Sequence, residues 1–206
     1  MRTIGVGSTE PSAGAGFAGT GATKIIVACG ALALHIGQIA KRRGWDLEVR
    51  PLPPELHNRP ERIRAELGDA ALVGYADCGT RGALDDLPRL AGPDCYGIFG
   101  QFEQHEPGTY YLTDFLVRSF DRVVWRGLGI DRHPELRDDY FGNYERVVWL
   151  AQSPTAQLRA KAEAAAAKLG LPLDIRETGD SGLERALERL LVSDTSGVRH
   201  PGESLC

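Results

Sequence analysis

The sequence predicts an α/β fold with a mostly parallel sheet flanked by helices. Short apolar runs alternate along the chain with patterns of helical period, which is the order of successive βαβ units. Glycine follows the two clearest helical segments, at Gly44 and Gly170, where a helix end favours a residue that adopts positive φ. We expect an α/β domain over 23–192, built either as a single unit or as two similar βαβα lobes at 23–127 and 146–192.

The first half of this domain begins with a strand and a helix. The run KIIVA predicts the strand, and Leu32, Ile36 and Ile39 give the next segment one apolar face. Pro60, which follows a proline-rich loop, suits the first position of a helix, and Asp94 suits the N-cap of another. The expected elements are a strand over 24–28, a helix over 31–43, a strand over 46–50, a helix over 60–67, a strand over 70–75, a helix over 81–90, a short strand near 89–92 and a helix that starts at about Cys95.

The second half continues the same alternation. A stripe of apolar residues predicts a helix over 113–126, and Gly127 ends it. An acidic and aromatic connector follows over 130–145, and Ser153 suits the N-cap of the next helix. The remaining expected elements are a strand over 146–150, a helix over 154–169, a strand over 172–176 and a helix over 182–192.

The order of elements in the first half recurs in the second. The stretch from KIIVA to ERIRAEL has the same strand, helix, glycine, strand and helix as the stretch from RVVWL to LERALERL. This order indicates either an internal duplication or the general likeness of two α/β units. Ala151 stands where the first stretch has Cys29, so folding such a unit does not require a thiol at that position.

The composition argues against some classes of partner. The formal net charge is −4 and no run of Lys and Arg is longer than Lys41-Arg42-Arg43, so we expect no nucleic-acid partner. No apolar stretch reaches about 18 residues and no signal peptide is recognisable, so we expect no membrane partner, a cytoplasmic location and reduced cysteines. Residues 1–22 and 193–206 lack apolar periodicity, and we expect a disordered leader and tail there.

Three of the four cysteines stand in a matched setting, after a short apolar run and before an expected helix start. They are Cys29 in KIIVACG, Cys78 in ALVGYADCG and Cys95 in LAGPDCYG. Ligands collect at the carboxyl ends of parallel strands, and His57 in the proline-rich loop is a fourth candidate. Thiolate and imidazole groups bind zinc and iron–sulfur clusters. We therefore predict a metal site formed by these four residues, with zinc and an iron–sulfur cluster both open.

Several of these features have a second interpretation. Buried cysteines also pack as small apolar side chains. The segment CYGIF could itself be a strand, which would place Cys95 at the opposite edge of the sheet, although Asp94 before it favours a helix. Tyr110 and Tyr111, which precede a helix cap at Thr113, either pack in the core or line a cofactor pocket as hydrogen-bond donors.

Five motifs together resemble those of one protein family: ACG near the start, LH after the loop with two prolines, YADCG, DCYG and EPGTYYLTDFL. The family is the bacterial and archaeal domain of unknown function 1638, and the resemblance covers roughly residues 24–190. It implies a characteristic Cys, His, Cys, Cys set at Cys29, His57, Cys78 and Cys95. The resemblance also implies an association with corrinoid-dependent one-carbon methyl transfer, without an established activity.

The expected function is thus that of a metal- or iron–sulfur-binding protein, either an enzyme or an accessory in corrinoid-linked one-carbon metabolism. Its partner would be a small-molecule substrate, or a corrinoid or methyltransferase protein. One alternative is a metal-free cysteine-dependent enzyme with Cys29 or Cys78 as nucleophile and His57 as base. Another is a non-catalytic partner protein that docks through 130–145 or GTYYLTD. Whether the protein is an enzyme stays open.

Overall fold

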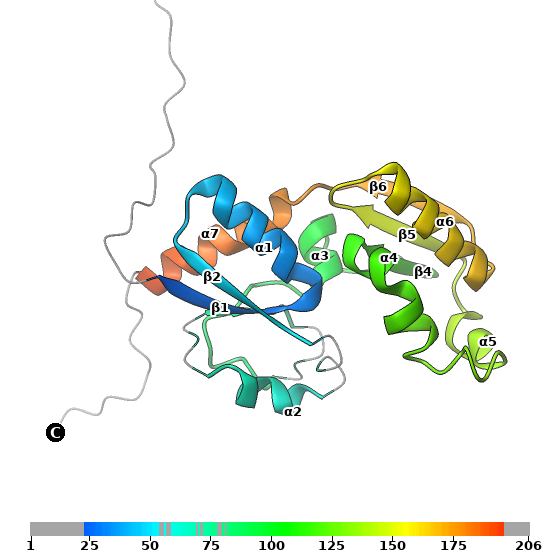
Figure 1. The fold of residues 1–206 in the computed structure, drawn as a ribbon, viewed down its shortest axis with the longest axis horizontal. Helices are drawn as coiled ribbons and strands as arrows, with labels where there is room; N and C mark the ends of the chain where they lie inside the picture. Colours follow the sequence, from blue (N-terminus) through cyan, green and yellow to red (C-terminus); the bar gives the residue numbers. More distant parts are fainter. Residues whose placement is uncertain are drawn as a thin grey trace, which may run out of the picture.

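Two three-stranded parallel sheets form the frame of the protein (Figure 1). The computed structural model describes residues 23–53, 56, 59–68, 70, 72–77, 80 and 82–195. The first sheet has the strand order β2-β1-β3 and the second β4-β5-β6, which confirms an α/β fold with parallel strands. The strands are β1 Lys24–Cys29, β2 Leu47–Leu52, β3 Leu72–Gly74, β4 Thr109–Thr113, β5 Arg146–Ala151 and β6 Leu173–Glu177.

β1 is the central strand of the first sheet, and its last four residues are buried. Helices cover both faces of this sheet, which is why KIIVAC is nearly continuous in apolar residues. α1 (Gly30–Arg43) and α7 (Ser181–Thr195) lie on one side and α2 (Pro60–Ile63) on the other (Figure 1). α1 ends as the sequence predicts, at a left-handed Gly44 with a φ of 65°.

Residues 89–92 run beside β3 and extend the first sheet by one short parallel segment. Val73 pairs in parallel with Arg89. Further along, the N–H of Asp77 donates a hydrogen bond to the carbonyl of Gly92 at 3.0 Å. The short strand expected near these residues is therefore present as a brief pairing at the edge of the sheet.

β5 is the central strand of the second sheet, and the two helices α4 (Asp114–Phe120) and α6 (Ala156–Leu169) lie on the same face of this sheet. They pack together there, and α5 (Leu136–Phe141) lies in the connector before β5. Both connections in this sheet step in the same direction, so right-handed crossovers place both helices on one face. The other face meets α3 (Cys95–Gly100).

The hydrophobic cores divide the chain differently from the expected lobes 23–127 and 146–192. β4 and α4 belong with the second sheet, whereas α7 crosses back to the first. Leu183, Leu187 and Leu190 of α7 recur at helical spacing and are buried in the same cluster as β1 and α1. The first core is therefore completed by the last helix, and this couples the two ends of the folded chain.

The helices expected over 81–90 and 113–126 differ most from the structure. The helix expected over 81–90 is wrong, because residues 82–86 form turns. The helix expected over 113–126 begins as the strand β4 ends, at the cap Thr113, and becomes a π-helix over Asp121–Trp125. The sequence prediction did not include β4, because its five residues run directly into α4 without a turn.

The predicted correspondence of the two halves holds for their first three elements. β1 and β5 each have six residues, α1 and α6 each have fourteen, and both helices end at a left-handed glycine. Cys29 and Ala151 both end their central strand. α6 starts two residues later than predicted, because the hydroxyl of Thr155 rather than Ser153 accepts the hydrogen bond from Leu158 N–H, at 3.1 Å.

The predicted ends of the chain fall largely outside the described residues. The leader expected over 1–22 and the tail beyond 195 belong to that part. Residues 193–195, which the sequence prediction placed in the tail, are the last residues of α7.

The packing of β3 against β1 and α1 predicts that alanine at Gly74 and alanine at Gly37 change the free energy of unfolding in opposite directions. A methyl group at Gly74 would lie 2.8 Å from the Cβ of Ala28 and 3.0 Å from Cδ1 of Ile36, whereas one at Gly37 meets nothing within 4 Å. We expect Gly74→Ala to lower the free energy of unfolding by about 2 kcal/mol, and Gly37→Ala in the interior of α1 to raise it by about 0.8 kcal/mol. Urea unfolding of both variants checks this, and equal effects would contradict the packing of β3.

Candidate functional site

Cys29 lies where the central strand of the first sheet ends. It is the last residue of β1 and directly precedes α1. Its side chain is buried in the first core, with 4% exposed. The unbonded N–H groups of the first turn of α1 open at this edge and favour electron-rich groups there.

Cys95 is the first residue of α3 and is also buried. Asp94 caps this helix, because its Oδ1 accepts a hydrogen bond from the N–H of Gly97 at 2.7 Å. Residues 89–92 run parallel to β3, so Cys95 follows their carboxyl end and belongs to the same edge of the first sheet as Cys29. The helical interpretation of CYGIF is confirmed, and its interpretation as a strand is wrong.

His57 and Cys78 lie outside the described residues, but their neighbours in the sequence are described. Leu56, before His57, is buried in the first core. Asp77, before Cys78, forms a hydrogen bond with the segment that leads to Cys95. Among the described residues no group of three or more His, Cys, Asp or Glu side chains is arranged to hold a metal ion. Only two of the four predicted ligands are among them, so the ligand set stays a prediction.

Tyr110 and Tyr111 point to opposite faces of the second sheet and are not brought together. Tyr110 packs edge-to-face with Phe141, with ring centroids 4.9 Å apart, and burial raises the pKa of its phenol. Tyr111 lies on the face toward α3, with its ring 5.2 Å from that of Phe102. The two tyrosines therefore do not line a common pocket, and each one packs in its own cluster.

His105 is a side chain near Cys95 that the sequence analysis had not placed at the site. Its Nε2 lies 2.7 Å from Oδ2 of Asp94, the residue that caps α3 with its other oxygen. The imidazole is 45% exposed and also packs against Tyr96. Asp94 thus orients an accessible imidazole at the start of α3, the helix that begins with Cys95. The only sequence signal was an aspartate that serves as a cap, which gives no indication of a second partner eleven residues away.

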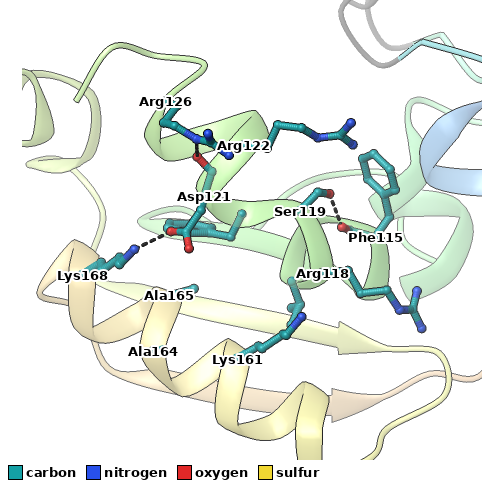
Figure 2. A pocket seen from close by; sticks show the side chains of 12 residues that line it. Phe115, Arg118, Ser119, Asp121, Arg122, Arg126, Lys161, Ala164, Ala165 and Lys168 are labelled. Atoms are coloured by element: carbon teal, nitrogen blue, oxygen red, sulfur yellow. Dashed lines mark hydrogen bonds and ion pairs between the residues drawn. The ribbon is translucent and has the colours of Figure 1, made fainter. Parts of the chain in front are cut away.

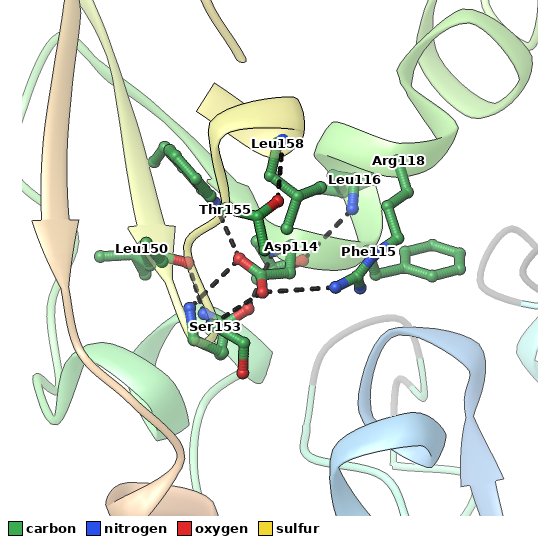
Figure 3. Close-up of polar contacts among 12 residues, drawn as sticks. Asp114, Phe115, Leu116, Arg118, Leu150, Ser153, Thr155 and Leu158 are labelled. Atoms are coloured by element: carbon green, nitrogen blue, oxygen red, sulfur yellow. Dashed lines mark hydrogen bonds and ion pairs between the residues drawn. The ribbon is translucent and has the colours of Figure 1, made fainter. Parts of the chain in front are cut away.

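The edge of the second sheet is organised by a buried carboxylate (Figure 3). Asp114 follows β4 directly and is fully buried. Its Oδ1 accepts hydrogen bonds from Trp149 Nε1 at 3.0 Å and from the N–H of Gln152 at 3.1 Å. Its Oδ2 accepts from the N–H of Ser153 at 2.9 Å and lies 3.5 Å from the guanidinium of Arg118. This one side chain fastens the end of β4 to the end of β5.

The carboxyl edges of the two sheets meet. Gly30 follows β1, and a methyl group there would lie 3.7 Å from the ring of Phe115, the second residue after β4. It would also lie 3.4 Å from the carbonyl oxygen of Leu52 at the end of β2. Figure 1 shows the strands of both sheets pointing toward this junction. The residues that follow the strands of both sheets therefore share one region, which is where ligands bind in α/β folds.

His35 is buried on α1 near this junction. It is 2% exposed, and its ring packs against Phe99 at 5.4 Å. Both ring nitrogens lack a hydrogen-bond partner within the described part of the chain. Burial lowers the pKa of this imidazole, while the charge of Asp114 opposes the shift and that of Arg118 adds to it. His35 is therefore neutral in the folded protein at neutral pH, at a cost in stability.

The hydrogen bonds of Asp114 predict a large effect of removing its charge. In Asp114→Asn an amide NH₂ replaces one acceptor oxygen and leaves a buried donor opposed to another donor. We expect the free energy of unfolding to fall by about 3 kcal/mol. The exposed Asp139→Asn is the control and should change it by less than about 0.5 kcal/mol. Equal stabilities in urea would show that Asp114 does not hold the edge of the second sheet.

The unpaired His35 predicts a pH-dependent gain in stability for His35→Leu. Because the folded-state pKa is lowered, the unfolded chain binds a proton first, and stability is lost as the pH falls below about 6.5. We expect the leucine variant to be more stable by about 1 kcal/mol at neutral pH, and by more at about pH 5.5. Urea unfolding at both pH values measures this. A constant difference between the two proteins would refute the assignment.

Comparison with known proteins places the chain in a family. No helix in the described part of the chain is long and apolar enough to cross a membrane. No curated protein and no solved structure matches the chain. The family model described as "Protein of unknown function (DUF1638)" matches residues 51–187. This match confirms the resemblance seen in the sequence motifs, and the chain belongs to the DUF1638 family.

Proposed function

We propose that this protein binds zinc or an iron–sulfur cluster through Cys29, His57, Cys78 and Cys95. One observation carries the proposal. Four neighbouring parallel segments, in the order β2, β1, β3 and 89–92, each end at the same edge and lead into a stretch of sequence with one of these residues. If the cysteines were only buried as apolar side chains, the fold would not need one predicted ligand after each of the four segments.

The spacing of the segments fits a single site. Neighbouring strands lie about 4.8 Å apart, so the ends of the four segments span about 14 Å. The turns after the strands can bring three thiols and an imidazole together over such a distance. The donor set suits a zinc ion or an iron–sulfur cluster. Zinc takes Cys₃His ligands in closed tetrahedral sites, and iron–sulfur clusters are held by cysteine thiolates.

The site also supports a role for Asp94 and His105. Asp94 begins the helix that carries Cys95 and holds His105 through its second oxygen. An imidazole oriented by a carboxylate is suited to accept and return a proton. In this proposal His105 supplies an acid–base group beside the metal, and the substrate is a small molecule or the methyl group of a corrinoid or methyltransferase partner.

Asp94 and His105 also favour a second candidate function. A metal-free cysteine enzyme needs a thiol, a base and a group that orients the base. Cys95, His105 and Asp94 are of these three types, and Asp94 and His105 are in contact. In this candidate Cys95 takes the place of the nucleophile predicted at Cys29 or Cys78. A single thiol that reacts much faster than the others with an alkylating reagent would favour it over the metal site.

Elemental analysis of protein expressed and purified without oxygen tests the metal proposal. We expect near-stoichiometric zinc, or several iron atoms and sulfide, in the wild type. Cys29→Ala and Cys78→Ala should each lose most of the metal, because removing one thiolate opens the site. Cys206 is outside the predicted site, so Cys206→Ala is the matched control and should keep the metal. A metal-free wild type, or variants that retain the metal, would contradict the proposal.

A further inference from the structure

A cleft that none of the described cysteines lines lies between α4, the π-helix that follows it, and α6 (Figure 2). Its volume is about 530 Å³, within the range of small-molecule sites. Among the described residues, five cationic side chains and one carboxylate, Asp121, line it; the cations are Arg118, Arg122, Arg126, Lys161 and Lys168. The whole chain has a formal charge of −4, so this positive charge is a local feature.

The cations come from two walls of the cleft. Arg118, Arg122 and Arg126 follow one another at intervals of four residues, and Lys161 and Lys168 are two helical turns apart on α6. The residues between the two lysines that line the cleft are Ala164 and Ala165, whose small side chains leave the space open. Like charges gathered around one cleft repel, which disfavours the arrangement unless an anion lies among them.

Two of the cations are held by groups of the cleft itself. Lys168 forms an ion pair with Asp121 and lies over the ring of Trp125, 5.4 Å from its centroid. The Nε of Arg126 donates to the carbonyl oxygen of Asp121 at 3.2 Å. The single carboxylate of the cleft is thus already occupied.

The charges of the other cations are less compensated. Arg118 reaches Asp114 at 3.5 Å, but that carboxylate accepts three shorter hydrogen bonds. Arg122 and Lys161, one from each wall, form no ion pair or side-chain hydrogen bond with any other described residue. These two side chains are therefore available to a ligand.

The backbone at the cleft departs from regular helix geometry. Ser119 has a φ of −114° and a ψ of 15°, and the five residues after Phe120 form a π-helix. Single π-helical turns inside helices are costly and often mark functional sites. Here the irregular turn contains Asp121 and Arg122, which line the cleft.

We propose that this cleft binds a small molecule bearing two or more phosphate charges. Guanidinium groups match phosphate oxygens in a bidentate geometry, and the lysines add point charges from the other wall. Phe115 lines the same cleft and packs next to Gly30, so the ligand would lie close to the junction of the two sheets. The proposal does not depend on the metal site, because none of its residues is a predicted metal ligand.

Isothermal titration of the full chain with inorganic pyrophosphate tests this proposal. We expect one pyrophosphate per chain and an affinity that falls as salt is added. Arg122→Gln and Lys161→Gln should each weaken binding by about tenfold or more, because each removes a charge-assisted hydrogen bond. Arg159→Gln is the matched control: Arg159 is exposed on α6, two residues from Lys161, and does not line the cleft.

The control should bind pyrophosphate as the wild type does. Circular dichroism and urea unfolding show whether each variant is folded, so a loss of binding is separated from a loss of structure. Three results would overturn the proposal: no binding of pyrophosphate to the wild type, equal weakening in all three variants, or binding of a single-stranded oligonucleotide in place of pyrophosphate.

Discussion

In both sheets a buried central strand has parallel neighbours on each side, and this pairing sends every strand out of the sheet at the same edge. The chain must then return over a face of the sheet before it can add the next strand. Cys29 is the last residue of β1, Asp114 and Gln152 directly follow β4 and β5, and Cys95 follows residues 89–92 by three positions. Thiol, carboxyl and amide side chains therefore gather at these edges, because parallel strands all leave their sheet on the same side.

Different interactions stabilise the edge of each sheet. At the second sheet, Asp114 binds the backbone that follows β5 and so fixes the start of α4. At the first, α7 returns from the end of the chain to cover α1, and Arg42 forms ion pairs with Asp180 and Glu184 at its start. Exposed ion pairs of this kind contribute little, so the apolar face of α7 supplies most of the attachment. Contacts of α1 with α4, and of α3 with β4 and β5, pack the two sheets against each other.

Local sequence signals predicted the elements that are set locally. Asp94 caps α3 with its side chain and Gly44 ends α1 in the left-handed conformation, and both predictions were confirmed. Contacts between distant segments were not predictable in this way. No stretch of sequence shows that α7 covers the first sheet, that His105 meets Asp94, or that cations of α4 and α6 share a cleft. Of the predicted metal ligands, the structure describes Cys29 and Cys95, which share an edge because residues 89–92 pair with β3.

X-ray absorption spectroscopy at the edge of the metal that copurifies with the anaerobic protein tests the central claim most directly, because it counts the ligand atoms. For zinc, the account predicts three sulfur atoms at about 2.3 Å and one nitrogen atom at about 2.0 Å. For a cluster it predicts a sulfur shell with iron–iron scattering. A first shell of oxygen and nitrogen atoms alone would contradict the assignment of the cysteines as ligands and leave the edge of the first sheet without a metal role.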